Sequence, residues 1–240
     1  MTGRPRIAVP GRFSASASAL RYRAVVNAHA LLEAVWAAGG DPVTLLPTPD
    51  PTPEETAARL AAYDGVLLPG GADINPALYG AAPEPGTDPP DDVQDAFDLA
   101  VLEYAIGHAV PLLTVCRGTQ LLNAALGGTL DQAFADPHVH VVQKVTPVDP
   151  VLFGPDSIPV SCYHRQRIDV LADALEPFAY AEDGTIEAVR YRAAPGWVFG
   201  VQWHPEDTAA TDAHQQLLLE HFVAAARDRG RDARHLRQTS

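Results

Sequence analysis

Lysine is nearly absent from this sequence of 240 residues, in which Lys144 is the single lysine among 17 basic residues. Acidic residues number 30, so the formal net charge at pH 7 is -13. Nucleic acids and anionic membranes attract positively charged surfaces, which a chain of this composition does not supply. The charge balance therefore argues against both as partners of the body of the protein.

Cysteine is scarce as well, with Cys116 and Cys162 as the two examples. Two cysteines are too few for the disulfide framework of a small secreted domain or for a cysteine-rich zinc site. His138 and His140 could bind a metal from one expected strand, but no further ligands cluster beside them in the sequence. Hydrogen-bonded or solvent-facing histidines are the favoured interpretation, and we expect neither a metal nor an organic cofactor.

Long apolar runs are also missing. No stretch approaches the length of a membrane-spanning helix, and residues 1–6 are not followed by the apolar segment of a signal peptide. We therefore expect a cytoplasmic protein whose thiols are reduced.

The first half of the chain alternates short apolar runs with amphipathic helical patterns. This alternation predicts an α/β fold, a three-layer α/β/α sandwich in which a mostly parallel central sheet carries helices on both faces. The expected strands are 6–10, 43–46, 65–68 and 111–115, and the expected helices are 23–38, 52–63, 92–108 and 118–126.

The second half has a different pattern. Residues 178–181, 186–191 and 197–201 are expected to form a small antiparallel meander, and a helix capped near Thr211 is expected to end near Ala226. We expect residues 1–226 to form a single domain and residues 227–240 to form a basic, flexible tail.

Cys116 lies at the tight turn between the apolar strand 111–115 and the helix that follows it. Such a turn lifts a side chain above the edge of the sheet and points backbone N–H groups at whatever binds there. The helix N-terminus and the adjacent Arg117 would favour the reactive thiolate. Taken alone, Cys116 also fits a small buried hydrophobic residue, so the rest of the chain has to decide.

Two further segments are expected at the same edge of the sheet, because each follows a strand. Gly71 and Arg117 offer backbone N–H groups for an oxyanion hole, and His204 and Glu206 offer a base and the carboxylate that orients it. Together with Cys116 they supply what nucleophilic attack on an amide requires. Each motif alone is a modest signal, and the pair Gly70-Gly71 also fits a simple turn.

Four motifs in this order resemble those of class I glutamine amidotransferase-like hydrolases, and more narrowly the gamma-glutamyl-gamma-aminobutyrate hydrolase family, peptidase family C26. The matching segments are Pro69-Gly-Gly-Ala-Asp73, Cys116-Arg-Gly-Thr-Gln120, His164-Arg-Gln166 and Trp203-His-Pro-Glu206. They span nearly the whole chain. The resemblance implies a flavodoxin-like fold of the class I glutamine amidotransferase type.

The resemblance also implies an activity, which is hydrolysis of a small gamma-glutamyl amine or amino acid through a gamma-glutamyl thioester, with a link to polyamine catabolism. It implies a Cys116, His204 and Glu206 triad that needs no cofactor. The glutamyl end is expected to be held by a separate set of residues, namely Gly70, Gln120, His164 and Gln166. The expected partner is the small gamma-glutamyl substrate, with a homodimer as the candidate assembly.

Four positions depart from the pattern of the family. Ser161 and Cys162 stand where the family has Asn-Ser, Gln94 stands where it has arginine, and Thr114 replaces a smaller residue two positions before Cys116. None belongs to the triad, but they leave the amine half of the substrate open. Two alternatives also stay open, namely a glutaminase that feeds ammonia to a separate synthetase and a non-catalytic protein that binds glutamyl metabolites.

Overall fold

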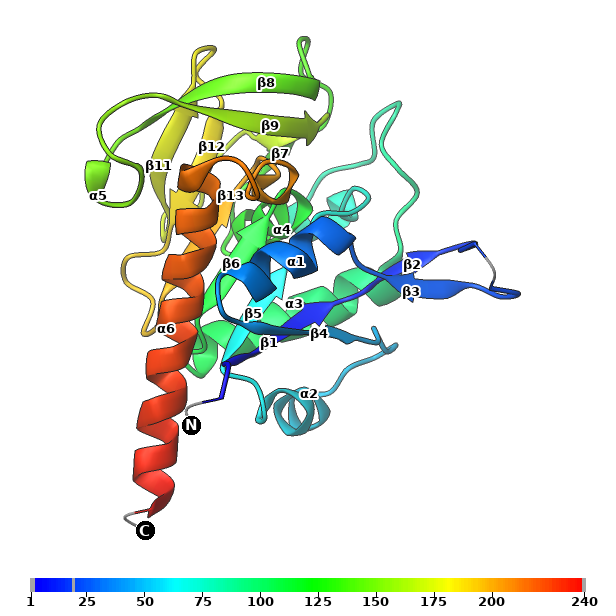
Figure 1. Ribbon diagram of the computed structural model, residues 1–240. Coiled ribbons are helices and arrows are strands. Elements are labelled where there is room, and N and C mark those ends of the chain that lie inside the picture. The colour runs from blue at the N-terminus through cyan, green and yellow to red at the C-terminus, as the bar shows by residue number, and fades with distance from the viewer. Residues whose placement is uncertain (1–2, 19, 239–240) are drawn as a thin grey trace.

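A nine-stranded sheet runs through the computed structural model, which describes residues 3–18 and 20–238. The strand order is β4-β1-β5-β6-β13-β12-β11-β8-β9 (Figure 1). The first five strands in this order are parallel, as the alternating sequence pattern predicts. They are β4 (Asp41–Leu45), β1 (Arg6–Pro10), β5 (Gly65–Leu68), β6 (Leu112–Val115) and β13 (Val198–Val201).

The other four strands are antiparallel and extend this sheet beyond β13. They are β12 (Ile186–Arg190), β11 (Glu176–Ala181), β8 (His138–Pro147) and β9 (Ile158–His164). The expected meander is therefore present and continues the main sheet. Two small antiparallel pairs lie apart from it: β2 (Arg12–Ser14) with β3 (Ala24–Val26), and β7 (Leu130–Asp131) with β10 (Arg167–Ile168).

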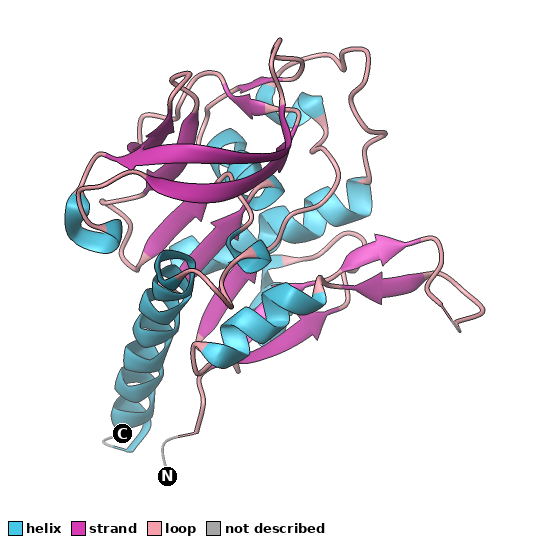
Figure 2. Ribbon diagram, turned by 45° about the horizontal axis from the view of Figure 1, so that its top comes forward, coloured by secondary structure: helices cyan, strands magenta, loops and turns pink. Residues whose placement is uncertain are grey.

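Helices cover both faces of the parallel strands, which gives the predicted three layers (Figure 2). One face packs against α1 (His29–Ala37) and the long α6 (Ala213–Gln238). The other packs against α2 (Pro53–Leu60), α3 (Asp92–Gly107) and α4 (Arg117–Ala125). Three single-turn elements complete the fold, namely α5 (Pro150–Phe153), η1 (Pro76–Tyr79) and η2 (Pro205–Asp207).

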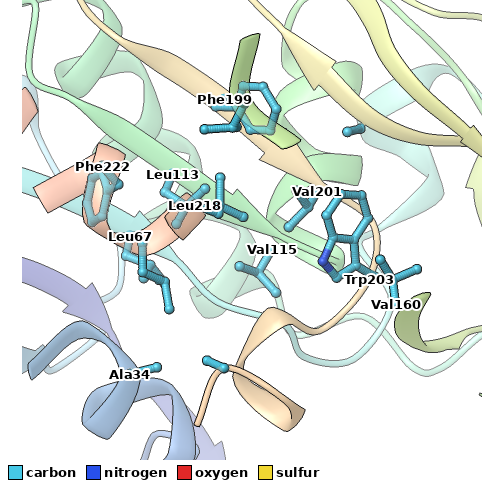
Figure 3. Close-up of a cluster of buried hydrophobic side chains, with 14 of the residues drawn as sticks. Ala34, Leu67, Leu113, Val115, Val160, Phe199, Val201, Trp203, Leu218 and Phe222 are labelled. Carbon is cyan, nitrogen blue, oxygen red and sulfur yellow. The ribbon is translucent and has the colours of Figure 1, made fainter. Parts of the chain in front are cut away.

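Alternate residues of the inner parallel strands β1, β5, β6 and β13 supply two separate cores. Leu67, Leu113 and Phe199 point to the core that includes Phe222 of α6 (Figure 3). Their chain neighbours, such as Leu112, point to the opposite core beneath α3 and α4. Because both faces are buried, these strands are continuous apolar runs, which is what makes them recognisable in the sequence.

Two predictions about helix limits are wrong. Residues 24–26, at the start of a predicted helix, form β3, which pairs with Arg12–Ser14 inside the segment 11–20 that lacked a predicted strand. The β-branched pair Val25 and Val26 favours a strand over a helix. The last helix does not end near Ala226 but continues to Gln238. Alanine and arginine there are good helix formers, and Asp228 pairs with Arg231 one turn away at 3.6 Å. The division into domain and tail stays a prediction.

Gly118 allows α4 to lie against β5, and this contact yields a test. A Cβ atom at Gly118 would lie 2.5 Å from the carbonyl oxygen of Leu68. Because a backbone atom cannot move aside cheaply, we expect Gly118→Ala to lower the free energy of unfolding by about 1–3 kcal/mol. Urea denaturation followed by circular dichroism measures this change.

Gly107, in α3, is the matched control. A Cβ atom there has open space around it. Gly107→Ala should therefore raise the free energy of unfolding by about 0.5–1 kcal/mol through helix propensity. Equal effects of the two substitutions would contradict the packing argument.

Candidate active site

Cys116 occupies the predicted turn between β6 and α4, in a strained backbone conformation. Its φ of 49° and ψ of -108° lie in a region that side chains other than glycine rarely adopt. The Cys116 N–H donates to the carbonyl of Val201 at 2.8 Å, and the Cys116 carbonyl accepts from the N–H groups of Thr119 and Gln120 at 2.9 and 3.1 Å. Neighbouring elements thus hold the turn from both sides.

His204 and Glu206 lie at the end of β13, where the sequence placed them. His204 Nδ1 is 2.9 Å from Glu206 Oε1, so Nδ1 carries the proton that the carboxylate accepts. The His204 N–H donates to the Ser161 carbonyl at 2.8 Å, which ties the segment to β9. This arrangement leaves His204 Nε2 buried and free of a hydrogen-bond partner among the described residues.

Gly70 stands between the imidazole and the cysteine. A Cβ atom at Gly70 would lie 2.9 Å from Cε1 of His204 and 3.7 Å from Cβ of Cys116. The side chains of His204 and Cys116 therefore approach each other across Gly70, where a larger residue would contact the imidazole. The structure brings Cys116, His204 and Glu206 together at one edge of the sheet.

The electrostatic setting of His204 favours its charged form. Burial opposes the imidazolium, but contacts with Cys116 and Glu206 outweigh burial and raise the pKa of His204 to about 11. Gln202 also donates from Nε2 to Cys116 Sγ at 3.6 Å. A protonated His204 is suited to act as a general acid beside a cysteine nucleophile.

The two predicted oxyanion-hole residues lie beside this turn. Arg117 is the first residue of α4, so its N–H is one of those that find no acceptor inside the helix. Gly71 follows β5, and a Cβ atom there would lie 2.8 Å from Nε of Arg12 and 3.0 Å from Cδ of Arg117. The Gly71 segment and the cysteine turn thus meet through two arginine side chains.

These arginines belong to a buried ion network that the sequence did not reveal. Arg117 pairs with Asp95 and Asp98 of α3. Arg12 pairs with Asp98 at 2.9 Å and donates to the carbonyls of Gly70 at 2.7 Å and Pro69 at 2.6 Å. Burial lowers the pKa of Arg12 to about 10, above neutral pH, so the guanidinium keeps its charge. Arg12 therefore fastens the predicted oxyanion loop to the cysteine turn.

A cleft of about 410 Å³ opens over Cys116. This volume suits a small ligand. Its wall includes Gly71, Gln120, His164 and His204, four residues that the sequence assigned to the site. The remaining lining residues are Ala72, Asp73, Asp88, Val139, Tyr163 and Arg165.

Gln166 and Gly70 are absent from the wall of this cleft. Gln166 is buried, and its backbone carbonyl accepts from Gln120 Nε2 at 3.2 Å and from His164 Nδ1 at 2.9 Å. Gly70 lies between His204 and Cys116. Gln166 and Gly70 therefore contact other predicted site residues without lining the cleft themselves.

None of the departures from the family pattern lines the cleft. Thr114 is buried, and its hydroxyl lies 2.9 Å from that of Thr119. Ser161 donates to Asp207 at 2.6 Å, and Cys162 points into the protein interior. Gln94 donates to Asp98 Oδ1 at 3.0 Å and joins the ion network.

Sequence reasoning missed several residues around the cysteine, because no local motif marks them. Arg12 lies 86 positions from its partner Asp98, and the two meet only in the folded chain, where Arg12 of β2 reaches α3. Arg165, of the His164 motif, had no role assigned and lines the cleft with Asp73 and Asp88.

Known proteins share both the motifs and the fold of this chain. Residues 5–206 match the family model described as Peptidase C26. A protein of Mycobacterium tuberculosis, named provisionally as a glutamine amidotransferase, is 39% identical over 72% of this chain and 60% of its own length. The chain thus spans less than two thirds of that relative.

Two further likenesses agree with this match. The gamma-glutamyl-gamma-aminobutyrate hydrolase of Escherichia coli is 30% identical over 81% of this chain and 84% of its own. A crystal structure from Thermoplasma acidophilum, described provisionally as one of the subunits of GMP synthase, shares the fold with a TM-score of 0.66, 18% identity and 98% coverage of both chains.

The family match covers the parallel strands, the cysteine turn and the His204 segment, and it implies amide hydrolase chemistry. None of the helices in the described part of the chain combines the length and apolar character that a bilayer crossing requires. The chain belongs to the Peptidase C26 family.

Proposed function

We propose that this chain hydrolyses the amide bond of a small gamma-glutamyl amine or amino acid, of the gamma-glutamyl-gamma-aminobutyrate type, and releases glutamate. The observation that carries the proposal is the convergence of Cys116, His204 and Glu206 beside a small cleft. The similarity to a gamma-glutamyl-gamma-aminobutyrate hydrolase supports the choice of substrate class.

The first half of the reaction forms a thioester. Cys116 Sγ attacks the gamma carbonyl carbon, and the carbonyl oxygen becomes an oxyanion that accepts hydrogen bonds from the N–H groups of Gly71 and Arg117. His204 Nε2 then gives its proton to the amide nitrogen as the C–N bond breaks. The amine leaves, and the glutamyl group stays bonded to sulfur.

The second half returns the enzyme to its starting state. Water attacks the thioester carbonyl while the neutral His204 Nε2 takes one of its protons. The C–S bond breaks, glutamate leaves and Cys116 regains its thiolate beside the imidazolium. Glu206 keeps Nδ1 protonated throughout, so Nε2 always faces the reacting atoms.

The charges at the cleft suit a substrate with charged ends. Arg165 offers a guanidinium for a carboxylate, and Asp73 and Asp88 offer carboxylates for an ammonium group. Gln120 and His164 line the same wall and are proposed to hold the glutamyl end, His164 through its backbone because both of its ring nitrogens face other groups of the protein. The amine half is then proposed to lie toward Arg165, whose guanidinium suits the carboxylate of gamma-aminobutyrate, while the ammonium group of the glutamyl end faces Asp73 or Asp88.

The first prediction concerns the nucleophile. The purified chain should release glutamate from one or more members of a panel of gamma-glutamyl amines, and Cys116→Ala should lower kcat/KM by about 10³-fold or more because no thioester can form. Glutamate release is measured over the panel with glutamine included. Undiminished hydrolysis by the alanine variant would refute the mechanism. Hydrolysis of glutamine that appears only when a synthetase is added would favour the ammonia-supplying alternative.

The second prediction concerns Glu206. Glu206 is one of the groups that raise the pKa of His204 to about 11, so Glu206→Gln should lower that pKa. Deprotonation removes the general acid, so the fall of activity at alkaline pH should begin at lower pH in the variant. We also expect kcat/KM to fall by about 10²-fold or more. The pH profile of kcat/KM measures both effects.

Asp207 supplies the control for Glu206, since it is an exposed carboxylate at the next position and bonds to Ser161 instead. Asp207→Asn should keep the pH profile of the unmodified protein. If the fall of kcat/KM at alkaline pH shifts equally in both variants, Glu206 is not the group that raises the pKa of His204.

The third prediction concerns Arg12 as a positioning residue. Arg12→Lys keeps a positive charge near Asp98 but loses the fork that binds the carbonyls of Pro69 and Gly70. A displaced Gly71 N–H should lower kcat by about 10–100-fold while KM changes little. Arg23→Lys is the control, because Arg23 makes an exposed pair with Asp91 near the same hairpin. A change in KM alone, or equal effects of the two substitutions, would contradict this role.

A further inference from the structure

A second group of polar side chains is buried behind the cleft, and the triad does not use it. It consists of His138 of β8, Cys162 and His164 of β9, and Glu187 of β12, all at most 4% exposed. One potential ligand atom from each lies within 4.8 Å of those of the others. Glu187 lies 49 positions beyond His138, so no local motif marks the group.

Strand pairing explains how these residues meet. His138 lies opposite His164, and Val141 lies opposite Cys162, with a bulge between Val139 and Val141. Alternation along β9 sends Cys162 and His164 to the same buried side. Glu187 comes from β12, which β11 separates from β8 in the sheet. His138 Nδ1 lies 2.8 Å and His164 Nε2 lies 3.3 Å from Glu187 Oε1.

The outer nitrogen of each histidine faces an acceptor. His164 Nδ1 lies 2.9 Å from the carbonyl of Gln166, and a carbonyl can only accept, so Nδ1 carries a proton. His138 Nε2 lies 3.3 Å from the carboxylate of Asp183, which places a proton on Nε2 in the same way. With each outer nitrogen protonated, the inner nitrogen offers a lone pair when its imidazole is neutral and donates to Glu187 when its imidazole is charged.

In the neutral form of both rings, the inner nitrogens would face the same carboxylate oxygen with lone pairs. His164 Nε2 is buried and has no hydrogen-bond partner among the described residues, although Glu187 Oε1 is close by. Lone pairs that point at a carboxylate oxygen repel it unless a positive charge lies between them. Two added protons would supply that charge, and so would one divalent cation.

Cys162 favours the cation. Its Sγ lies 3.9 Å from both carboxylate oxygens of Glu187, so a thiolate would complete a set of two nitrogens, one sulfur and one oxygen. Bonds of about 2.0–2.3 Å to a tetrahedral zinc ion put ligand atoms about 3.3–3.8 Å apart. Three distances to Glu187, of 2.8, 3.3 and 3.9 Å, bracket this range, and all four ligand atoms lie within 4.8 Å of one another. Histidines whose second nitrogens bind a carboxylate and a carbonyl are also the usual surroundings of zinc.

We propose that His138, Cys162, His164 and Glu187 bind one Zn²⁺ ion as a closed structural site. The ion replaces the thiol proton and satisfies both inner nitrogens, so it fixes β8, β9 and β12 to one another. Because Tyr163 and His164 of β9 line the cleft, the site also holds that wall in place. Cys116 and His204 take no part in it.

Cobalt substitution tests the proposal on the full chain. In a Cys116→Ser background, which removes the only other cysteine, metal-free protein should take up one equivalent of Co²⁺ and show the near-ultraviolet absorption of a thiolate bound to cobalt. Zn²⁺ should displace the cobalt. Adding Cys162→Ser should abolish that absorption and weaken Zn²⁺ binding by about 100-fold or more. This loss exceeds the one expected when only a hydrogen-bond partner of a ligand is removed.

Asp183→Asn provides a variant that leaves the four ligands intact. It should weaken Zn²⁺ binding by about 10–100-fold while the cobalt absorption stays. Thermal denaturation of each metal-free variant identifies a variant that fails to fold. Two results would overturn the site. In the first, the Cys116→Ser protein takes up no metal. In the second, the cobalt–thiolate absorption of the unmodified protein needs Cys116 and survives Cys162→Ser; in either case the four side chains form a protonated hydrogen-bond network.

Discussion

The strained backbone at Cys116 is the constraint on which the site depends. A positive φ at a residue other than glycine costs on the order of 1–3 kcal/mol and persists only where its surroundings enforce it. Here β13 accepts the Cys116 N–H, and the first turn of α4 engages the Cys116 carbonyl. Gly118 lets that turn lie directly against Leu68 of β5. Cys116, the proposed nucleophile, is therefore positioned by the packing of strands and helix before any substrate arrives.

The same constraint explains why so much charge is buried next to it. Arg117 must follow Cys116, and its side chain is buried among α3 residues, so Asp95 and Asp98 are needed to neutralise it. Arg12 then balances the second carboxylate and uses its remaining donors on the loop of Gly70. An ion network that begins as compensation for a buried arginine thereby fixes Gly71 and Arg117, the proposed donors of an oxyanion hole, relative to each other.

The sequence was informative wherever the chemistry is local. Apolar runs located β5 and β6 within a residue, and the segments around Cys116 and His204 follow directly from strand ends. It failed where the outcome depends on distant partners. Val25 and Val26 form a strand because Phe13 and its neighbours pair with them, and Arg12 acquires its role from the Gly70 loop, 58 positions away. Glu187 carries no motif, and only the fold shows that two histidines and a cysteine converge on it.

Two buried polar groups thus flank the cleft, and they differ in their balance of charge. The first group is the ion network, and its two arginines and two aspartates cancel each other's charge within the protein. The group behind places Glu187 at full burial against two histidines and a cysteine, none of which carries a permanent positive charge as arginine does. A fully buried carboxylate without a fixed counter-charge is unfavourable. A bound cation would restore in the second group the balance that arginine provides in the first, and it would do so at the strand that carries His164 into the cleft.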